Sequence, residues 1–391
     1  MPAKPSHRTV TKAARPVKKP AARVAEPKVP ATPGGARPAA PSADDLLRQL
    51  SEAVAVSGDE GAVRRLILDA IAGSVDDVRV DALGNVLAVK KGAGRGERLL
   101  VAAHMDEVGF MVTGIDSDGS LRFEIVGSID ERVLLGKPVL VGPKRLPGVI
   151  GAMPVHLVSA DQRTAVVKAT RMRIDIGADS EAAAKKLVKP GDRAGFASEF
   201  SVLGPSFRGK ALDDRLGCAA LVELLRGPAF HFDLHAAFTV QEEVGLRGAK
   251  VAAFATDPQA AFVLDCTPAN DLPHSNEEKE NTQYNTRLGL GPAIYVADRA
   301  TISDQRLVAH LQRTAERAGL PYQLRQPGGG GTDAGAIHLA REGVPSVSLS
   351  VPGRYLHTPF SIARADDWRH AMALMRAALE AWTPAVLKRK A

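Results

Sequence analysis

Apolar segments and amphipathic helical patterns alternate along the chain, and this alternation constrains the fold more than any other feature of the sequence. In the second half, a helical pattern at 216–225 precedes the apolar runs LHAAFTVQ and AAFVLD, and helical patterns at 307–317 and 368–382 flank a third run, PSVSLSV. Two more runs, NVLAVK and RLLVAAH, follow helical patterns that begin near Ser42 and span 63–71. Strands alternating with helices predict an α/β fold, in which a mostly parallel sheet is covered by helices on both faces.

The stretch from 112 to 200 has a different pattern. Short Val, Ile and Leu runs alternate with turn residues there, and one helix is predicted around DSEAAAKKLV. A β-rich stretch between two α/β stretches is typical of an inserted domain. We therefore expect one α/β domain made of 43–111 and 201–391, with a β-rich domain at 112–200 inserted into it.

Residues 1–42 are rich in Pro, Ala and Lys. Nine Lys and Arg residues and one acid give this segment a formal charge of +8, so the rest of the chain carries −1 of the total of +7. Such a segment buries too little apolar surface to offset its ordering entropy, and we predict a disordered, solubilising tail. A tether to nucleic acid or another anionic surface and an organellar transit peptide are the alternatives. The near-neutral remainder argues against nucleic acid as a partner of the folded part.

Cysteine usage and hydropathy bear on the location of the protein. No apolar run approaches the roughly 20 residues that cross a bilayer, and the N-terminus lacks the apolar core of a secretory signal. Cys218 and Cys266 are the two cysteines of the chain and cannot build a disulfide framework. These features predict a cytoplasmic protein with reduced thiols and no membrane partner.

Side chains of the kind that bind metals follow the predicted strands. They are His104 with Asp106, Glu242 with Glu243, Asp265 and His357, and a further pair, Asp213 with Asp214, begins a helix. In open α/β sheets, ligands bind beyond the carboxyl ends of the strands. Imidazole and carboxylate without thiolate suit zinc, cobalt or manganese. Two histidines and three carboxylates exceed the needs of one catalytic zinc and fit two ions about 3.5–4 Å apart.

The adjacent glutamates restrict the local structure. Neighbouring residues of a strand point to opposite faces of a sheet, so Glu242 and Glu243 cannot both reach one site from within a strand. We expect them beyond the strand's end, where Val244 and Gly245 let the chain turn.

Six segments, in order, resemble the successive motifs of the tetrahedral (TET) aminopeptidases: AHMDEVGFMV, GKALDDRLGCA, TVQEEVGLRGA, VLDCTPAND, GGGGTDAGAI and RYLHTPF. That cytosolic family contains leucyl-, glutamyl- and lysyl-preferring enzymes with two metal ions, and some relatives carry an endoglucanase label. The resemblance extends from about Ser42 to Trp382. It implies a zinc-peptidase-like α/β domain, a dimerisation domain at 112–200, and dimers that build a hollow dodecamer open to short peptides.

The resemblance also implies the metal ligands. Asp213 would bridge two divalent ions per chain, zinc or cobalt, with manganese as a further possibility. His104 and Asp265 would complete the coordination of one ion, and Glu243 and His357 that of the other.

The remaining site residues follow from the same motifs. Glu242 would be the general base that takes a proton from a metal-bridging water, and Asp106 would accept the second ring N–H of His104. Thr332 and Asp333 would shape the substrate site; the glycines before them lack the Lys-Ser/Thr of a phosphate-binding loop. Asp214 stands where the family often has Asn.

Three other functions compete with an aminopeptidase that acts on short peptides. A glycoside hydrolase would need two carboxylates and no metal. A scaffold or nucleic-acid binder would use the basic tail, and another amide hydrolase, such as a deacylase or dipeptidase, would share the metal site. The position of the β-rich insert after His104 favours the aminopeptidase. His310 and His338 fall on helical patterns and are expected at the surface or as satisfied core residues; His156 is expected to be structural, with an assembly contact as the alternative. The preferred N-terminal residue and the physiological metal have no marker in the sequence.

Overall fold

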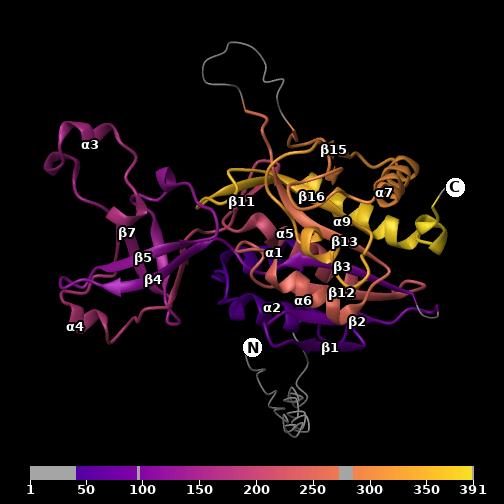
Figure 1. Ribbon diagram of the computed structural model, residues 1–391, viewed down its shortest axis with the longest axis horizontal. Coiled ribbons are helices and arrows are strands. Elements are labelled where there is room, and N and C mark those ends of the chain that lie inside the picture. Colours follow the sequence, from indigo (N-terminus) through magenta and orange to yellow (C-terminus); the bar gives the residue numbers. More distant parts are fainter. Residues whose placement is uncertain (1–40, 95–96, 273–284, 390–391) are drawn as a thin grey trace, which may run out of the picture. The chain divides into compact units, whose positions relative to one another are not determined.

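The computed structural model describes residues 41–94, 97–272 and 285–389 (Figure 1). All but the last two residues of the predicted tail lie outside these ranges, and its disorder stays a prediction. The first helix, α1 (Ala43–Glu52), begins where the sequence predicts it, because the Ser42 hydroxyl accepts a hydrogen bond from the Asp45 N–H at 3.2 Å. An N-cap of this kind satisfies one of the backbone donors that a helix leaves unpaired.

An eleven-stranded sheet forms the centre of the described α/β region. Its main path runs in the order β1 (Asp77–Val80), β2 (Val86–Lys90), β12 (Asp233–Thr239), β3 (Arg98–His104), β13 (Ala260–Pro268), β16 (Ser346–Arg354), β17 (Ser361–Arg364), β11 (Ser206–Gly209) and β10 (Ser201–Leu203). Two further strands, β14 (Ala293–Tyr295) and β15 (Gln323–Arg325), extend from β16.

The direction of these strands corrects one prediction. The four central strands β12, β3, β13 and β16 run parallel, but β1, β2, β17, β11 and β10 pair antiparallel with their neighbours. The expectation of a mostly parallel sheet is therefore wrong outside the centre. Short turns explain the difference: β1 and β2, and likewise β10 and β11, are joined by too few residues for the crossover that parallel neighbours require.

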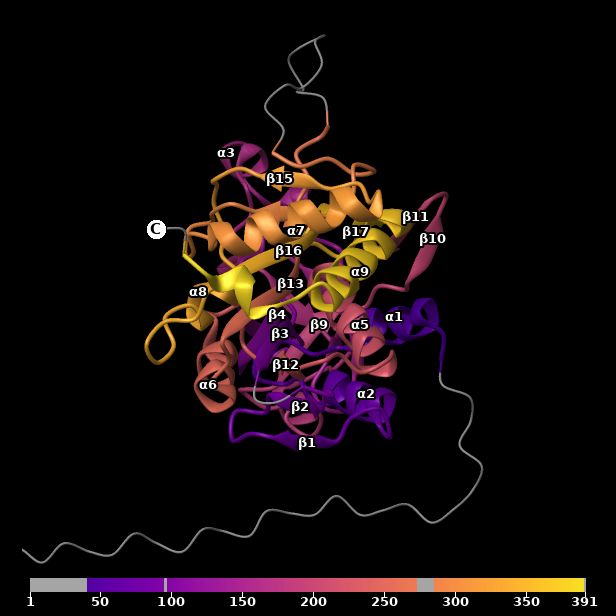
Figure 2. The ribbon, with the colours of Figure 1, turned by 90° about the vertical axis from the view of Figure 1, so that its right-hand side faces the viewer.

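Helices cover both faces of the sheet, as predicted. Figure 2 shows α6 (Arg247–Thr256) and α8 (Ala334–Ile337) on one side of it. The other side carries α1, α2 (Gly61–Ile71), α5 (Leu212–Arg226) and α9 (Ala365–Glu380), and α7 (Gln305–Ala318) packs in the same apolar core. Successive side chains of β3 point to opposite faces of the sheet and so pack in two apolar cores. Val101 packs in the core on the α5 side and Leu100 in the core on the α6 side. Among the described residues, no helix combines the length and apolarity needed to span a membrane.

A closed barrel lies between β3 and β10 in the sequence (Figure 1). Its strands, in spatial order, are β4 (Gly109–Ile115), β5 (Leu121–Val126), β8 (Arg173–Asp175), β7 (Leu146–Gly151), β6 (Pro138–Val141) and β9 (Arg193–Phe196). The ring of Phe110 meets those of Phe123 and Phe196 edge-on in the barrel core, with centroids 5.1 and 5.3 Å away. The β-rich character of this stretch agrees with the prediction.

The helices of the barrel region agree only partly with the sequence pattern. The predicted helix is present as the single turn α4 (Glu181–Ala184). A second helix, α3 (Ala160–Thr164), was not predicted, because five polar and small residues give no apolar periodicity. Short 3-10 turns complete the connections: η1 (Glu131–Val133), η2 (Val155–Leu157), η3 (Ala169–Arg171) and, near the C-terminus, η4 (Pro384–Leu387).

Candidate metal centre

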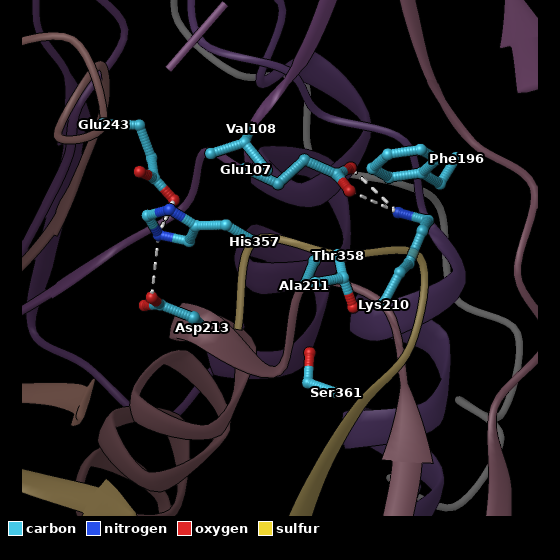
Figure 3. A pocket seen from close by; sticks show the side chains of 10 residues that line it. All are labelled: Glu107, Val108, Phe196, Lys210, Ala211, Asp213, Glu243, His357, Thr358 and Ser361. Atoms are coloured by element: carbon cyan, nitrogen blue, oxygen red, sulfur yellow. Dashed lines mark hydrogen bonds and ion pairs between the residues drawn. The ribbon is translucent and has the colours of Figure 1, made fainter. Parts of the chain in front are cut away.

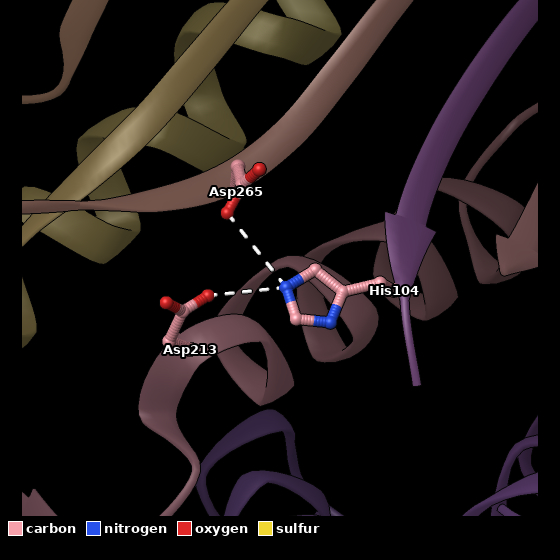
Figure 4. A group of neighbouring side chains, drawn as sticks. All are labelled: His104, Asp213 and Asp265. Atoms are coloured by element: carbon pink, nitrogen blue, oxygen red, sulfur yellow. Dashed lines mark hydrogen bonds and ion pairs between the residues drawn. The ribbon is translucent and has the colours of Figure 1, made fainter. Parts of the chain in front are cut away.

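The five predicted ligands meet at the carboxyl edge of the central sheet. Strands β3, β13 and β16 are successive parallel neighbours, so their carboxyl ends open on the same edge. The predicted ligands form two groups there that share Asp213, and the ligand atoms of each group lie within 4.8 Å of one another. The groups are His104, Asp213 and Asp265 (Figure 4), and Asp213, Glu243 and His357 (Figure 3). Asp213 also forms a third group of this kind with Asp214 and Cys266.

The first group is held by the buried ends of two strands. His104 is the last residue of β3, and its Nε2 lies 3.1 Å from Asp213 Oδ1 and 3.9 Å from Asp265 Oδ1. Asp265 lies within β13, and its Oδ1 also accepts the N–H of Cys266 at 2.7 Å. The side chains of His104 and Asp265 are 3% and 6% exposed.

The second group is held by loops. His357 lies between β16 and β17 with a positive φ of 58°. Its Nε2 is 3.4 Å from Asp213 Oδ2 and 3.3 Å from Glu243 Oε1. Its Nδ1 lies 2.8 Å from the main-chain oxygen of Ser128, which follows β5 of the barrel. The side chain of His357 is 33% exposed, so this group is the more open of the two.

The hydrogen-bonding chemistry of the two rings fits bound cations. In a neutral histidine, the nitrogen opposite the N–H carries a lone pair. Donation from His357 Nδ1 to Ser128 leaves the Nε2 lone pair facing two carboxylate oxygens. His104 is arranged in the same way, since its Nδ1 lies 3.2 Å from the main-chain oxygen of Asp106 and its Nε2 faces Asp213. A proton or a metal ion must separate such acceptors, and these nitrogen and oxygen donors suit zinc, cobalt or manganese.

The pKa shifts of the site residues also indicate that the site favours a positive charge. Burial alone would lower the pKa of His357, but Asp213 and Glu243 outweigh it and raise this pKa to about 11. Burial raises the pKa of Asp265 well above its usual value, and the neighbouring Asp213 carboxylate adds to the effect. Burial likewise raises the pKa of Glu243. Carboxylates crowded in this way favour a proton or cation among them.

Glu242 and Glu243 lie beyond the end of their strand, as predicted. Strand β12 ends at Thr239, and the chain then turns through Gln241 (φ 56°) and Gly245 (φ 120°). The pKa of Glu242 is raised well above its usual value, first by burial and then by the carboxylates of Asp333 and Glu243, while His104 acts in the opposite direction. A carboxylate near the two groups that binds protons readily has the properties expected of a base.

Asp106 makes contacts that the sequence did not indicate. Its Oδ1 lies 3.6 Å from His104 Nδ1, which is longer than a hydrogen bond, and the ring is closer to the Asp106 main-chain oxygen. Its carboxylate instead accepts the main-chain N–H groups of Glu242 at 2.9 Å and Glu243 at 3.2 Å. Asp106 is completely buried, and it connects the end of β3 to the turn after β12.

Thr332 and Asp333 lie under the site, each 1% exposed. The Thr239 hydroxyl donates to Asp333 Oδ2 at 2.5 Å, and the Thr332 hydroxyl is 2.7 Å from that of Ser348. Burial raises the pKa of Asp333 to about 6, although His104 opposes this rise. The structure therefore places Asp333 against the end of β12 and Thr332 against the first half of β16, while the glycines at 328–331 are exposed.

Asp214 and the two cysteines support the ligands from behind. The peptide bond between Asp213 and Asp214 is cis. The Asp214 carboxylate accepts the main-chain N–H groups of Gly217 at 2.9 Å and His104 at 3.2 Å, so an acid is accommodated at this position. Both thiols are free and buried, and the thiol of Cys218 donates to the His104 main-chain oxygen at 3.1 Å. They act as small buried donors, since the thiol of Cys266 donates to the Leu212 main-chain oxygen at 3.2 Å.

A buried ion pair borders the second group (Figure 3). The Lys210 ammonium lies 2.8 Å from both oxygens of Glu107 and also donates to the Ala53 main-chain oxygen at 2.9 Å. Burial lowers the pKa of Lys210 to about 8, although Glu107 opposes the shift. Sequence reasoning missed this pair, which joins Glu107 of the motif AHMDEV to Lys210 of the motif GKALDD.

Comparison with known proteins identifies the family of this chain. The sequence pattern of the M42 glutamyl aminopeptidase family matches residues 84–374, and the chain belongs to this family. A putative aminopeptidase of Acetivibrio thermocellus is 40% identical over 332 residues, which cover 85% of this chain and 96% of that protein.

Solved structures show the same relationship. A TET aminopeptidase from a marine sediment archaeon, Thaumarchaeota archaeon SCGC AB-539-E09, is 38% identical with a TM-score of 0.83, over 88% of this chain and 98% of that one. The TET1 peptidase of Pyrococcus horikoshii, which can assemble into a tetrahedron or a large octahedral shell, is 37% identical with a TM-score of 0.77, over 87% and 100% of the two chains.

Proposed function

We propose that this chain is an aminopeptidase that holds two divalent cations and removes N-terminal residues from short peptides. One observation carries the proposal: Asp213 turns one carboxylate oxygen toward each of two histidines, Oδ1 toward His104 at 3.1 Å and Oδ2 toward His357 at 3.4 Å. A carboxylate shared in this way is the expected bridge of a two-metal hydrolase. Membership of an aminopeptidase family supports the same reaction.

The ligands divide into two sets around this bridge. His104 and Asp265 would hold one ion, Glu243 and His357 the other, and Asp213 both. Zinc or cobalt suits these donors, with manganese as a further possibility. Ions of this kind polarise a carbonyl oxygen and lower the pKa of a bound water to about 7.

Glu242 is the residue to which we assign proton transfer. Its carboxylate would take a proton from the attacking water and give it to the amine that leaves. Buried beside other carboxylates, Glu242 has a pKa raised toward the range in which a general base works best. Asp106 would hold the backbone of Glu242, and Thr332 and Asp333 would shape the floor beneath it.

Hydrolysis of aminoacyl-p-nitroanilides tests the proposal. We expect release of p-nitroaniline by protein loaded with zinc, cobalt or manganese, loss of that activity in chelator, and recovery when metal is restored. The same series of substrates identifies the preferred N-terminal residue. Activity that is indifferent to chelator would contradict the proposal.

A glycoside hydrolase is the alternative that the same assay separates. Such an enzyme uses two carboxylates about 5–10 Å apart without metal. In this site the acids Asp213, Asp265 and Glu243 face histidine nitrogens at 3.1–3.9 Å, which is an arrangement for cations and not for a sugar ring.

We also propose that the barrel pairs chains into dimers, and that dimers form a dodecamer. The segment after β7 exposes apolar side chains that a monomer has no reason to leave in water: Met153, Val155 and Leu157 are 64%, 66% and 64% exposed. The Pyrococcus horikoshii relative forms closed shells, which supports the proposal. Light scattering on metal-loaded protein tests it, and a mass near one chain of 41.2 kDa would contradict it.

A further inference from the structure

We propose that Ser57 and Glu60, in the loop between α1 and α2, are positioning residues for Glu242. They hold the turn after β12 through its main chain and touch no reacting atom. The inference rests on the proposed function, because it takes Glu242 as the general base.

Ser57 acts through Asp106. The Ser57 hydroxyl donates to Asp106 Oδ2 at 2.6 Å. The same carboxylate accepts the N–H of Glu242 on Oδ1 at 2.9 Å and the N–H of Glu243 on Oδ2 at 3.2 Å. Ser57 is 3% exposed, so no water replaces its hydroxyl without rearrangement. The hydroxyl therefore fixes the rotation of the carboxylate that holds both glutamates.

Glu60 reaches the same turn directly. Its Oε1 accepts the N–H of Gly58 at 2.6 Å and the N–H of Gln241 at 3.3 Å. Glu60 is 3% exposed as well, and burial raises its pKa. A single oxygen thus joins the loop of Ser57 to the residue that precedes Glu242.

The loop is itself fixed to the end of β3. The N–H of Glu107 donates to the Ala55 oxygen at 3.0 Å, and the N–H of Ser57 donates to the Glu107 oxygen at 3.3 Å. Val56 and Glu107 consequently form an isolated parallel bridge. Through this loop, Ser57 and Glu60 therefore hold the turn after β12 in a fixed position relative to the sheet.

The turn needs such support because its own conformation is unusual. Gln241 and Leu246 have positive φ values of 56°, a region that residues other than glycine occupy only when their surroundings enforce it. Asn85 holds the base of the turn, accepting the N–H of Val240 at 2.9 Å and donating to the Gly248 oxygen at 3.0 Å. Asp106 and Glu60 hold the segment between these points, which carries Glu242.

Substitution of Ser57 separates positioning from general stability. The variants are Ser57→Ala, which removes the hydroxyl, and Ser57→Thr, which retains it. Ser346→Ala is the matched control, because Ser346 is 2% exposed and donates to the Val344 oxygen at 2.8 Å, at the end of β16 that is remote from the site. Each metal-loaded variant is measured for kcat, KM, metal content and hydrogen exchange of the peptide covering 240–248.

The expected pattern is specific to a positioning role. Ser57→Ala lowers kcat by about 10–100-fold, the range seen when a partner of a catalytic ligand is removed. Its KM and metal content match the control, its 240–248 peptide exchanges faster, and Ser57→Thr restores both kcat and protection. A structural role alone would lower stability in Ser57→Ala and Ser346→Ala to the same degree, without a fall in kcat at unchanged KM and metal content that is confined to Ser57→Ala.

Other outcomes overturn the inference. A kcat for Ser57→Ala equal to that of Ser346→Ala, or a loss of kcat that follows a loss of metal, would do so. If Ser57→Ala does not fold, Glu60→Ala is judged by the same criteria. A wild-type protein that holds metal but cleaves no aminoacyl substrate refutes the proposed function instead, and exchange at 240–248 still decides whether Ser57 holds the turn.

Discussion

The two halves of the metal centre are built in different ways. His104 and Asp265 lie on neighbouring parallel strands, and both side chains are almost fully buried. Glu243 and His357 lie on loops, and the ring of His357 is one-third exposed and held by a main-chain oxygen of the barrel region. The sheet positions the first half through its own hydrogen-bond ladder. The second half depends on segments distant in sequence, including the segment that follows β5 of the barrel.

This difference makes the barrel region part of the candidate site. Ser128 is separated from His357 by 229 residues, and the hydrogen bond between them orients the ring toward Asp213. We therefore expect the strand half to retain its ion more firmly than the loop half.

Removal of the shared ligand should have the largest effect, because it dismantles both halves. Asp213→Ala is expected to lose both ions and to lower kcat by about 10³-fold or more, since metal ions supply several kcal/mol of transition-state stabilisation. Elemental analysis and the aminoacyl-p-nitroanilide assay measure the two effects. Asp214→Asn is the comparison, because the Asp214 carboxylate accepts the main-chain N–H groups of His104 and Gly217 and belongs to neither of the two predicted ligand sets. Full metal content in Asp213→Ala would refute the bridge.

Substitution of Glu242, the proposed base, should leave metal binding by both halves of the centre intact. Glu242→Gln keeps the size of the side chain and removes its capacity to accept a proton, so kcat is expected to fall by about 10²–10⁴-fold with no change in metal content. Steady-state kinetics and elemental analysis on the same preparation provide the measurement. A kcat close to that of the wild type would assign proton transfer to another group.

Substitution of each histidine should distinguish the halves. His357→Ala is expected to lose the ion of the loop half and to keep Tm near that of the wild type, because the side chain is partly exposed. His104→Ala is expected to lose the ion of the strand half and to lower Tm more, because it opens a cavity at a buried position. Elemental analysis and thermal unfolding test the pair. Equal effects on Tm would remove the distinction between the halves.

The smallest expected effect is the release of protons when the protein takes up metal. His357 has a raised pKa of about 11 in the metal-free protein against 6.5 for an unperturbed ring, so it is protonated at pH 8. Its contribution to the stability of metal-free protein is full below pH 6.5 and is lost as the pH rises through 11. Metal must displace this proton, so uptake should release protons and affinity should rise with pH. A pH-stat titration measures the release, and His357→Asn should reduce it.

The clustering of the candidate ligands was predictable because its signal is local. A continuous apolar run that leads to His, Asp or Glu marks a buried strand, as at His104, the last residue of β3, and at Asp265 within β13. The helices α5, α7 and α9 were predictable for the same reason, since each has an apolar face of several turns.

The contacts that complete the site were not predictable, because they join distant segments. No residue pattern indicates that Asp106 binds the main chain of Glu242, or that Ser57 reaches Asp106. The contact of His357 with Ser128 uses a main-chain atom, which leaves no trace in the sequence. The antiparallel edge strands were missed because three or four residues, as in β10 and β1, carry too little periodicity to reveal a direction.

The hydrogen bond from His357 to the Ser128 oxygen has a consequence for how such a protein can diverge. Every residue type, proline included, offers a main-chain oxygen, so position 128 can change its side chain and still orient the ring. The barrel can therefore accumulate substitutions at this position while the hydrogen bond to His357 persists. The side chain of residue 128 and the main-chain oxygen that orients the ring are then free to evolve separately.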